Sequence, residues 1–176
     1  ISHLLPTVCN DSVWHIINLA SIFEDLGGNC MLILSPIEEC DRNALQGTSY
    51  DTMSNEQWSR LLSESMQKVH EKNYFEFYKL LDDNRIVGFM NLYAHSAHII
   101  SCGPTIKLPY RRSGYAYQGE IMALSIAKSK GYTIAVGGVD EDNSASRGLH
   151  EKLGFELERI YTNAQGRKIC LYIKAL

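Results

Sequence analysis

Apolar residues recur at intervals of three and four along several stretches of the chain, a spacing that predicts amphipathic helices. Ser54 and Gln57 form a capping box at the start of one such stretch, and Asn143 can cap another. Gly131 and Gly154 supply stop signals for two of the stretches. Helices are therefore predicted at about residues 12–26, 55–69, 115–130 and 144–153.

Short apolar or aromatic runs between these stretches predict strands. They cover about residues 3–8, 74–81, 85–93, 98–106, 132–139, 155–161 and 168–173. Residues 82–84, Asp-Asp-Asn, have turn chemistry and predict a hairpin. The run at 132–139 is apolar enough for a strand buried on both faces, and residues 29–52 are expected to be a loop that holds one short element.

The order of these elements predicts a single mixed sheet, with antiparallel strands first and then an alternation of strand and helix. Gly103 and Pro104 do not fit the middle of a regular ladder, so they predict a bulge or a sheet edge. The chain of 176 residues is long enough for one domain with its own core. We therefore expect one α/β (α+β) domain over residues 1–176.

The most informative stretch is residues 111–116, Arg-Arg-Ser-Gly-Tyr-Ala, which joins a strand end to a helix start. The first amides of a helix have no intrahelical partner, and with the helix dipole they attract phosphate groups. Gly114 and Ala116 leave the backbone accessible, while Arg111 and Arg112 add positive charge. The turn predicts a phosphate or pyrophosphate site, although small residues also serve as plain punctuation at a helix start.

Composition narrows the classes of function. A formal charge of −3 argues against a nucleic-acid surface, and no apolar run is long enough for a membrane span. The first residues lack the pattern of a signal peptide, and the odd, scattered cysteines suggest neither a disulfide framework nor a metal site. These cysteines are Cys9, Cys30, Cys40, Cys102 and Cys170. We expect a cytoplasmic protein that binds no metal, no nucleic acid and no membrane.

Two motifs carry a family resemblance. Residues 106–116 and, after a helix and a strand, residues 143–155 (Asn-Ser-Ala-Ser-Arg-Gly-Leu-His-Glu-Lys-Leu-Gly-Phe) resemble the acetyl-CoA-binding core of the Gcn5-related N-acetyltransferases (GNAT). The second motif is similar to the phosphinothricin-type branch. The resemblance covers about the last 80 residues. It implies that residues 1–73 shape the acceptor side and that residues 74–176 hold the sheet and the acetyl-CoA site.

The resemblance implies a sheet with two central parallel strands, 98–106 and 132–138, that splay apart around acetyl-CoA. The pantetheine arm would bond to the free edge of the first strand and the pyrophosphate to the amides of the turn. The implied cofactor-binding residues are Ile106, Leu108, Arg111, Arg112, Ser113, Gly114, Tyr115, Ala116, Asn143 and Ser146. Gly137 and Gly138 fit a close approach of the cofactor to the second strand, and they fit loop punctuation equally well.

Acyl transfer to an amine needs a neutral amine, a stabilised oxyanion and a proton for the departing thiolate. The family often has a tyrosine acid where this chain has His150, so His150 is a candidate general acid, with a packing role as the alternative. The strand at 98–106 has no carboxylate, so a water relay through His95, His98 and Ser101 is the candidate base. Glu120 interrupts an apolar stripe. It would either make a polar contact with the early helices or supply an acidic group to the pocket.

The sequence thus predicts an N-acetyltransferase that moves an acetyl group from acetyl-CoA to a primary amine of a small molecule. A non-catalytic acyl-CoA sensor of the same fold and an enzyme that acetylates a peptide or protein amine remain as alternatives. The acidic residues at 38–41 would favour a cationic acceptor if they line the pocket. A homodimer is compatible with the sequence. A plain nucleotide binder is disfavoured because no Walker lysine follows the turn.

Overall fold

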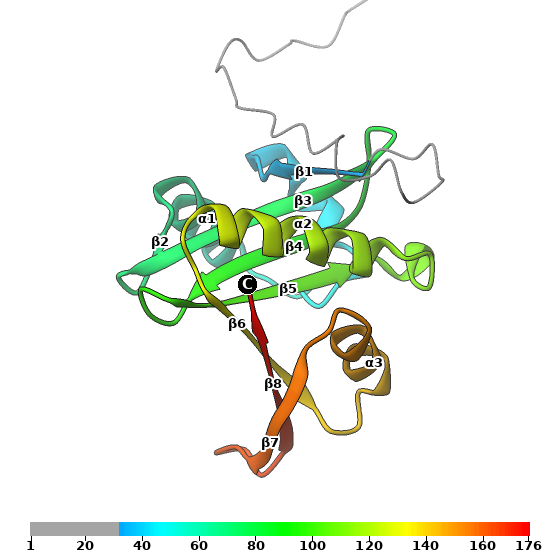
Figure 1. Cartoon of the computed structure of the whole chain (residues 1–176). Coiled ribbons are helices and arrows are strands. Elements are labelled where there is room, and N and C mark those ends of the chain that lie inside the picture. The colour runs from blue at the N-terminus through cyan, green and yellow to red at the C-terminus, as the bar shows by residue number, and fades with distance from the viewer. Residues whose placement is uncertain (1–31) are drawn as a thin grey trace, which may run out of the picture.

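The computed structural model describes residues 32–176, which form one eight-stranded sheet with helices on both faces (Figure 1). The strands are β1 (Ile33–Pro36), β2 (Val69–His70), β3 (Asn73–Asp82), β4 (Arg85–Ala94), β5 (Ile99–Ile106), β6 (Ile134–Asp140), β7 (Glu156–Thr162) and β8 (Lys168–Ala175). The helices are η3 (Glu39–Leu45), α1 (Asn55–Gln67), η4 (Leu108–Tyr110), α2 (Tyr115–Ser129) and α3 (Ser144–Lys152). The predicted strand at 3–8 and the first predicted helix lie outside the described residues.

The strand order is β1-β3-β4-β5-β6-β8-β7, with the two-residue β2 paired to β3. Each neighbouring pair is antiparallel except β5 and β6, which run parallel. This parallel pairing joins residues 99–101 to residues 134–136 and then stops. Beyond it β6, β8 and β7 descend steeply away from the rest of the sheet (Figure 1). The predicted mixed sheet with a splayed parallel pair is therefore confirmed.

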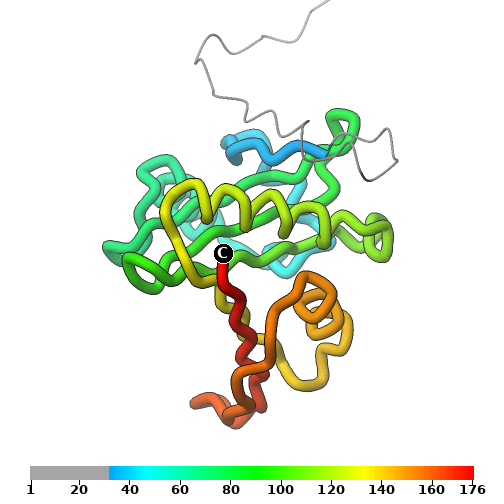
Figure 2. The backbone as a smooth tube through the Cα atoms, viewed as in Figure 1, coloured from blue at the N-terminus to red at the C-terminus, as the bar shows by residue number. Residues whose placement is uncertain are grey.

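The helices divide between the two faces of the sheet (Figure 2). Alternate side chains along a strand point to opposite faces, so β3 and β4 each contribute to two apolar cores. Leu80 and Met90 belong to the core under α2, which continues along β5, β6 and β8. Phe77 and Phe89 stack at 5.6 Å in the second core, under α1, where Trp58 is 1% exposed. The second core anchors η3 and α1 to the sheet.

Local capping interactions set the helix boundaries that the sequence predicts. Ser54 Oγ accepts a hydrogen bond from the amide of Gln57, whose side chain accepts one from the amide of Ser54, and α1 begins there. The side chain of Asn143 accepts from the amide of Ser146 at the start of α3. Since partners three residues apart form these bonds, a short sequence window is enough to predict them.

Three details differ from expectation. Residues 29–52 were expected to hold one short element, but their described part contains both β1 and η3. The predicted bulge at Gly103 and Pro104 is wrong, because both residues stay in regular register with β4. The sheet-edge alternative holds instead, since β5 has already left β6 at that point and Pro104 needs no partner there. β6 is not buried on both faces, since Gly138 is exposed.

The acidic segment at residues 38–41 is paired with a buried lysine. Lys79 Nζ lies 2.7 Å from a carboxylate oxygen of Glu38 and 2.9 Å from one of Asp41. These two carboxylates and Cys40 lie close enough together to hold a metal ion, but the ammonium group already bonds to both carboxylates. The ion pairs thus fasten η3 to β3, and Lys79 offsets one of the three negative charges of this segment.

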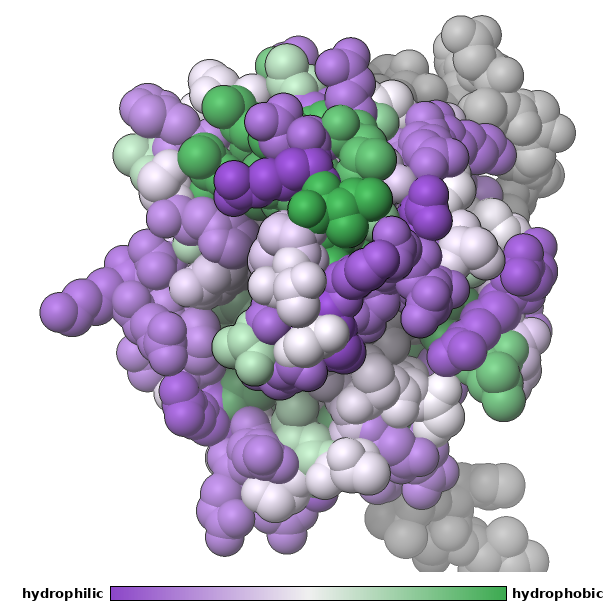
Figure 3. All heavy atoms as spheres, turned by 90° about the horizontal axis from the view of Figure 1, so that it is seen from below, coloured by the Kyte–Doolittle hydropathy of each residue, from purple (hydrophilic) through white to green (hydrophobic). Residues whose placement is uncertain are grey.

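β7 forms one edge of the sheet and is exposed along its whole length. It carries apolar side chains at Leu157, Ile160 and Tyr161 that are each more than two-fifths exposed. Viewed from below, the surface is largely hydrophilic, with one larger group of hydrophobic residues and a few smaller ones (Figure 3). None of the helices between residues 32 and 176 combines the length and the apolar composition needed to span a bilayer.

Candidate active site

The opening between β5 and β6 is the central feature of the candidate site. After residues 99–101, the pairing with β6 ends, and residues 102–106 of β5 have strand partners on the β4 side alone among the described residues. Residues 137–140 of β6 likewise pair with β8 and not with β5. Backbone amides and carbonyls that face such a gap are available to an extended ligand.

The predicted anion turn lies at the wide end of this opening, between η4 and α2. Gly114 precedes the first residue of α2 with φ of +84°, a left-handed conformation that glycine adopts without strain. No side chain caps α2 at Gly114, so the start of this helix is open to another hydrogen-bond acceptor. Arg112 also has a positive φ of +67°, and residues 111–114 are exposed. This geometry suits a phosphate group.

Two interactions hold the turn in place. The Tyr115 hydroxyl donates to a carboxylate oxygen of Asp82 at 2.5 Å, which ties the start of α2 to the β3–β4 hairpin. Arg111 Nε donates to the carbonyl of Ile106 at 3.1 Å. Of the two predicted pantetheine positions, Ile106 ends β5 with its carbonyl bonded to Arg111. The other, Leu108, lies beyond the strand in η4 and is 65% exposed.

α3 borders the opening on the β6 side and carries the other predicted residues. The side chain of Asn143 is engaged in capping α3, and Ser146 is half-buried one turn further on. His150 is buried at 6% exposure, with its ring 5.0 Å from Phe155 and 5.3 Å from Tyr172. These contacts place His150 on the side of α3 that packs against the sheet.

The ring of His150 lies directly over Gly137, which is the first residue of β6 beyond the pairing with β5. Its Nδ1 atom lies 2.8 Å from the carbonyl oxygen of Ser146. A carbonyl oxygen can only accept, so Nδ1 carries a hydrogen. In the neutral ring Nε2 is therefore an acceptor, and it becomes a proton donor only in the imidazolium form. Nε2 is the atom on the Gly137 side, at the splayed part of β6.

The candidate water relay divides into two places. Ser101 Oγ lies 3.0 Å from His95 Nε2 and donates to the carbonyl of Tyr93 at 3.4 Å. Burial lowers the pKa of His95, which favours its neutral form. Ser101 is also the last residue of β5 that pairs with β6. His98 lies instead in the exposed turn before β5, with its amide bonded to Ser96. Of the three residues that the sequence proposed for the relay, the structure brings Ser101 and His95 together and places His98 apart from them.

Glu120 lies inside the protein on α2 and is 1% exposed. Neither carboxylate oxygen has a hydrogen-bond partner among the described residues. Burial raises its pKa to about 8, so the carboxyl is largely protonated at neutral pH. Burial also raises the pKa of the Cys102 thiol on β5, and the charge of Glu120 adds to that effect. From the sequence, Glu120 could be identified only as an acidic residue within an apolar stripe.

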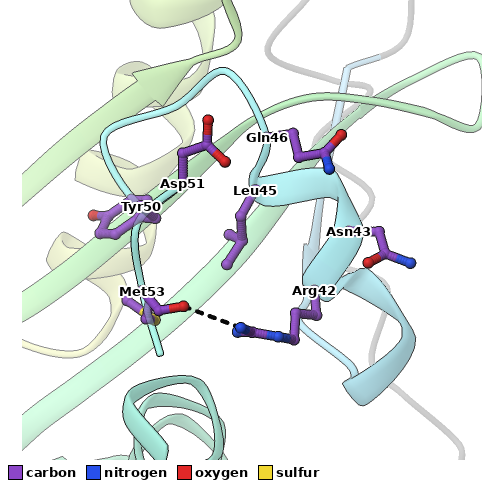
Figure 4. A pocket seen from close by; sticks show the side chains of 7 residues that line it. All are labelled: Arg42, Asn43, Leu45, Gln46, Tyr50, Asp51 and Met53. Carbon is purple, nitrogen blue, oxygen red and sulfur yellow. Dashed lines mark hydrogen bonds between the residues drawn. The ribbon is translucent and has the colours of Figure 1, made fainter. Parts of the chain in front are cut away.

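A small cavity of about 120 Å³ lies on the α1 side of the sheet (Figure 4). It is lined by Arg42, Asn43, Leu45, Gln46, Tyr50, Asp51 and Met53. The guanidinium of Arg42 donates to the carbonyl of Met53 at 3.0 Å and stabilises its wall. Burial raises the pKa of Tyr50, and hydrogen bonds to Thr105 and Asn91 partly offset this effect. Tyr50 therefore links the cavity to the free part of β5, a connection that sequence patterns did not indicate.

A mixed sheet that opens at one parallel pair, with an uncapped glycine-started helix at the opening, defines the acyl-CoA N-acyltransferase fold. The family model of the acetyltransferase (GNAT) domain matches residues 32–156, and the chain belongs to this family. It is accordingly an acetyltransferase, as the sequence predicted. The match leaves the phosphinothricin-type placement within the family a prediction. A comparison with proteins of curated function finds no match in sequence.

Solved structures with the same fold share little sequence with the chain. An acetyltransferase from Salmonella typhimurium that modifies the N-terminal serine of the 50S ribosomal subunit protein L7/L12 is 18% identical, with a TM-score of 0.68 over 82% of this chain and 95% of that one. An N-acetyltransferase from Staphylococcus aureus Mu50 is 19% identical, with a TM-score of 0.67 over 84% and 99%. Mycobacterium smegmatis RimJ, in complex with CoA-disulfide, is 16% identical, with a TM-score of 0.68 over 82% and 81%.

Proposed function

We propose that this protein transfers the acetyl group of acetyl-CoA directly to a primary amine, within a complex that holds both substrates. The observation that carries the proposal is the junction of a free strand edge with an uncapped helix start. Residues 102–106 of β5 lead through the turn to Gly114 and α2. An elongated ligand with an amide-containing arm and a pyrophosphate fits this sequence of donors and acceptors.

The residues present fit coenzyme A at each end of the opening. The amides that start α2 and the charges of Arg111 and Arg112 would hold the pyrophosphate. The free edge of β5 would bond the pantetheine arm. Asn143 and Ser146 would border that arm from α3, on the opposite side of the opening. Acetyl-CoA supplies an activated thioester when bound.

Side chains and backbone amides of the protein would then transfer protons and stabilise the developing negative charge. A free backbone amide on β5 beyond Ser101 would stabilise the negative charge that develops on the thioester oxygen. His150 would hold or release a proton at Nε2, where the splayed part of β6 begins. Ser101 and His95 would relay a proton from the amine to water. No step needs a covalent bond to the protein, so the cysteines have no catalytic part in this mechanism.

For the acceptor we propose a small-molecule amine that enters beside Tyr50. The cavity there has a volume of about 120 Å³, which suits a compact group rather than a long peptide. Its lining is polar, with Asn43, Gln46 and Asp51 able to bond a hydroxyl or ammonium group. We place the reaction in the cytoplasm, where acetyl-CoA is available to a protein with reduced cysteines.

A protein N-terminus is the second candidate acceptor. The observation that favours it is the likeness in fold to the Salmonella typhimurium enzyme, which modifies the N-terminal serine of a ribosomal protein. An N-terminal residue could insert its amine toward the opening while the rest of the peptide stays on the surface. The two candidates differ in what occupies the cavity, so acceptors of different length distinguish them.

The test is steady release of CoA thiol from acetyl-CoA over a panel of amines. The panel contains amino acids, polyamines, aminoglycosides and short peptides with free or blocked N-termini. Turnover with a small amine supports the proposal, and turnover confined to free-N-terminal peptides supports the second candidate. Tight CoA binding without turnover on any amine would instead indicate a non-catalytic acyl-CoA sensor. The absence of CoA binding would refute all three.

A further inference from the structure

Asn91 of β4 and Gly103 of β5 lie directly opposite each other in the sheet, and neither residue is one that strands favour. Glycine within a strand often marks a place where another group comes close to the backbone. A Cβ atom on Gly103 would lie 2.9 Å from Asn91 Oδ1, which is closer than such atoms approach. The glycine therefore makes room for the Asn91 amide, and the amide oxygen lies over the backbone of β5.

This oxygen lies over the part of β5 that borders the opening. The pairing of β5 with β6 ends at Ser101, two residues before Gly103. The anion turn at Gly114 follows the other end of β5. An extended arm that runs inward from this turn along residues 102–106 would bring its acyl end close to Gly103. The acyl group and the oxygen of Asn91 would then meet at the same point of the strand.

Asn91 belongs to the face of the sheet that α1 covers. Its neighbour on the other side is Phe77 of β3, which packs in the second core under α1, and directly opposed residues share a face. α2, whose start would bind the pyrophosphate, lies on the opposite face (Figure 2). The cofactor would thus approach the opening from one face, and an amine that approaches from the other face meets the oxygen of Asn91.

Tyr50 connects Asn91 to the cavity of Figure 4, which it lines. Burial raises the pKa of Tyr50, and hydrogen bonds to Thr105 and Asn91 oppose this rise. A bond of that direction stabilises the phenolate, so Asn91 is the donor and uses its NH₂ group. Its oxygen is then the end of the amide that lies over Gly103. All four residues are half-buried, so a part of each stays accessible to a ligand.

We propose that Asn91 binds and orients the acceptor amine: Oδ1 accepts a hydrogen bond from the amine nitrogen, whose lone pair then faces the thioester carbon. The rest of the acceptor extends past Tyr50 into the cavity. An amide oxygen is too weak a base to remove a proton, so Asn91 positions the amine and the proton leaves through Ser101 and His95. The carbon–sulfur bond breaks with its electron pair on sulfur. The assignment rests on the proposed transferase function.

The cross-strand pair allows a test that displaces the Asn91 amide without mutating it. Asn91→Ala removes the oxygen, and Gly103→Ala pushes it away with a Cβ atom. Each variant is expected to lower kcat/KM for the amine about tenfold, with KM for acetyl-CoA and the calorimetric affinity for CoA changed by less than about twofold. In the double variant Gly103→Ala should add less than about twofold, because no oxygen remains to be displaced.

Asn73→Ala is the matched control. Asn73 is also a half-buried asparagine of the sheet, and its amide donates to the hydroxyl of Tyr93 at 3.3 Å. This variant is expected to keep the kinetic constants for both substrates. The acceptors are lysine, spermidine, kanamycin and the tripeptide Ser-Ala-Ala, and the comparison is made with each one that the wild type acetylates. Calorimetry with the same amine and the CoA-loaded proteins measures acceptor binding without turnover and should show the same order of variants.

The outcomes separate this proposal from the transferase function. A wild-type kcat/KM for the amine in a folded Asn91→Ala protein overturns the role of Asn91 alone. Full multiplication of the two single effects in the double variant, or an equal loss of CoA affinity, overturns it as well, because the pair would then act on the strand or the cofactor. If Asn91→Ala does not fold, Gly103→Ala alone decides, since only the far end of a side chain has to move. A wild-type protein that binds CoA and acetylates no amine overturns both.

Discussion

His150 occupies the space that a side chain at position 137 would need: a Cβ atom on Gly137 would lie 2.2 Å from His150 Nε2. No Cβ atom tolerates so short a contact, so the glycine on β6 and the histidine on α3 depend on each other. The histidine ring cannot move outward freely, because its Nδ1 bonds to the carbonyl of Ser146 and its faces meet Phe155 and Tyr172. The pair fixes α3 against the splayed part of β6.

This relationship predicts that substitution by alanine destabilises the protein at Gly137 but not at the adjacent Gly138. Gly137→Ala should displace His150 and lower the free energy of unfolding by about 1–3 kcal/mol, the usual cost of overpacking. Gly138→Ala is the matched control, because its Cβ would meet Ile169 at an ordinary 3.6 Å, and its effect should stay below about 0.5 kcal/mol. Urea denaturation of the three proteins measures both values. Equal stabilities for the two variants would show that His150 moves aside without cost.

The close contact at position 137 also shows where sequence reasoning ends. Gly137 was interpreted as a site of close approach by a cofactor or as loop punctuation, and the structure shows that it makes room for His150. These residues are thirteen apart, and nothing in their local sequence pairs them. By contrast, the caps at Ser54 and Asn143 were predicted correctly, because their partners lie three residues away.

The same distinction holds for the fold as a whole. Periodicity and turn chemistry located α1, α2, α3 and most of the strands, because these signals arise within one element. The splay of β5 and β6 came from the family resemblance and is confirmed by their short pairing. The ion pair of Lys79 with Asp41 joins residues 38 apart, so the sequence could not show that a buried lysine pairs with the acidic segment. The placement of Tyr50 beside Thr105 could not be predicted either, because these residues are also far apart in the sequence.

The two left-handed glycines at the ends of α2 offer a controlled test of the anion turn. Gly114 has φ of +84° and Gly131 has φ of +89°, and about 22 Å of helix separates them. Gly114→Glu should weaken CoA binding by about 100-fold, or about 3 kcal/mol, because it puts a negative charge beside the pyrophosphate. Gly131→Glu carries the same backbone strain and charge away from the turn, so it should bind CoA as the wild type does.

Titration calorimetry with CoA gives both affinities. Gly114→Ala separates strain from charge, since a Cβ there would meet nothing nearer than Gln118 Nε2 at 3.8 Å. We expect this variant to lose about 1 kcal/mol of stability and to retain most of its CoA affinity. An undiminished affinity in Gly114→Glu would mean that the pyrophosphate binds elsewhere.

The buried carboxyl of Glu120 predicts an unusual dependence of stability on pH. Its pKa is about 8 in the folded protein, against 4.5 for a glutamate that is fully exposed to water, as in the unfolded chain. Between these values the unfolded chain has lost its proton while the native protein keeps it, so the free energy of unfolding falls as pH rises, by roughly 1.4 kcal/mol per pH unit. Below pH 4.5 both states are protonated and the effect is absent, and above pH 8 both are ionised and the slope ends.

Glu120→Gln removes this titration at nearly constant shape. The variant should match the wild type near pH 4.5 and exceed it by several kcal/mol at about pH 8. The difference between the two proteins is the quantity to measure, because the lowered pKa of His95 acts in the opposite direction in both. Denaturant unfolding between about pH 4.5 and 8.5 provides it, with the exposed Glu158→Gln as control. A constant difference across this range would show that Glu120 is ionised like an exposed acid.

His150 provides the last prediction, which separates a proton-handling role from a packing role. His150→Phe keeps an aromatic ring against Phe155 and Tyr172, and His150→Gln keeps a polar end group that cannot be protonated near neutral pH. If Nε2 handles a proton in the reaction, both variants should lose about 100-fold in kcat and lose the limb of the pH–rate profile that the imidazole produces, with CoA affinity unchanged. If His150 only packs, His150→Phe should keep the wild-type kcat and pH profile. Steady-state kinetics from about pH 5 to 9, with the calorimetric CoA affinity of each variant as control, decides between the two roles.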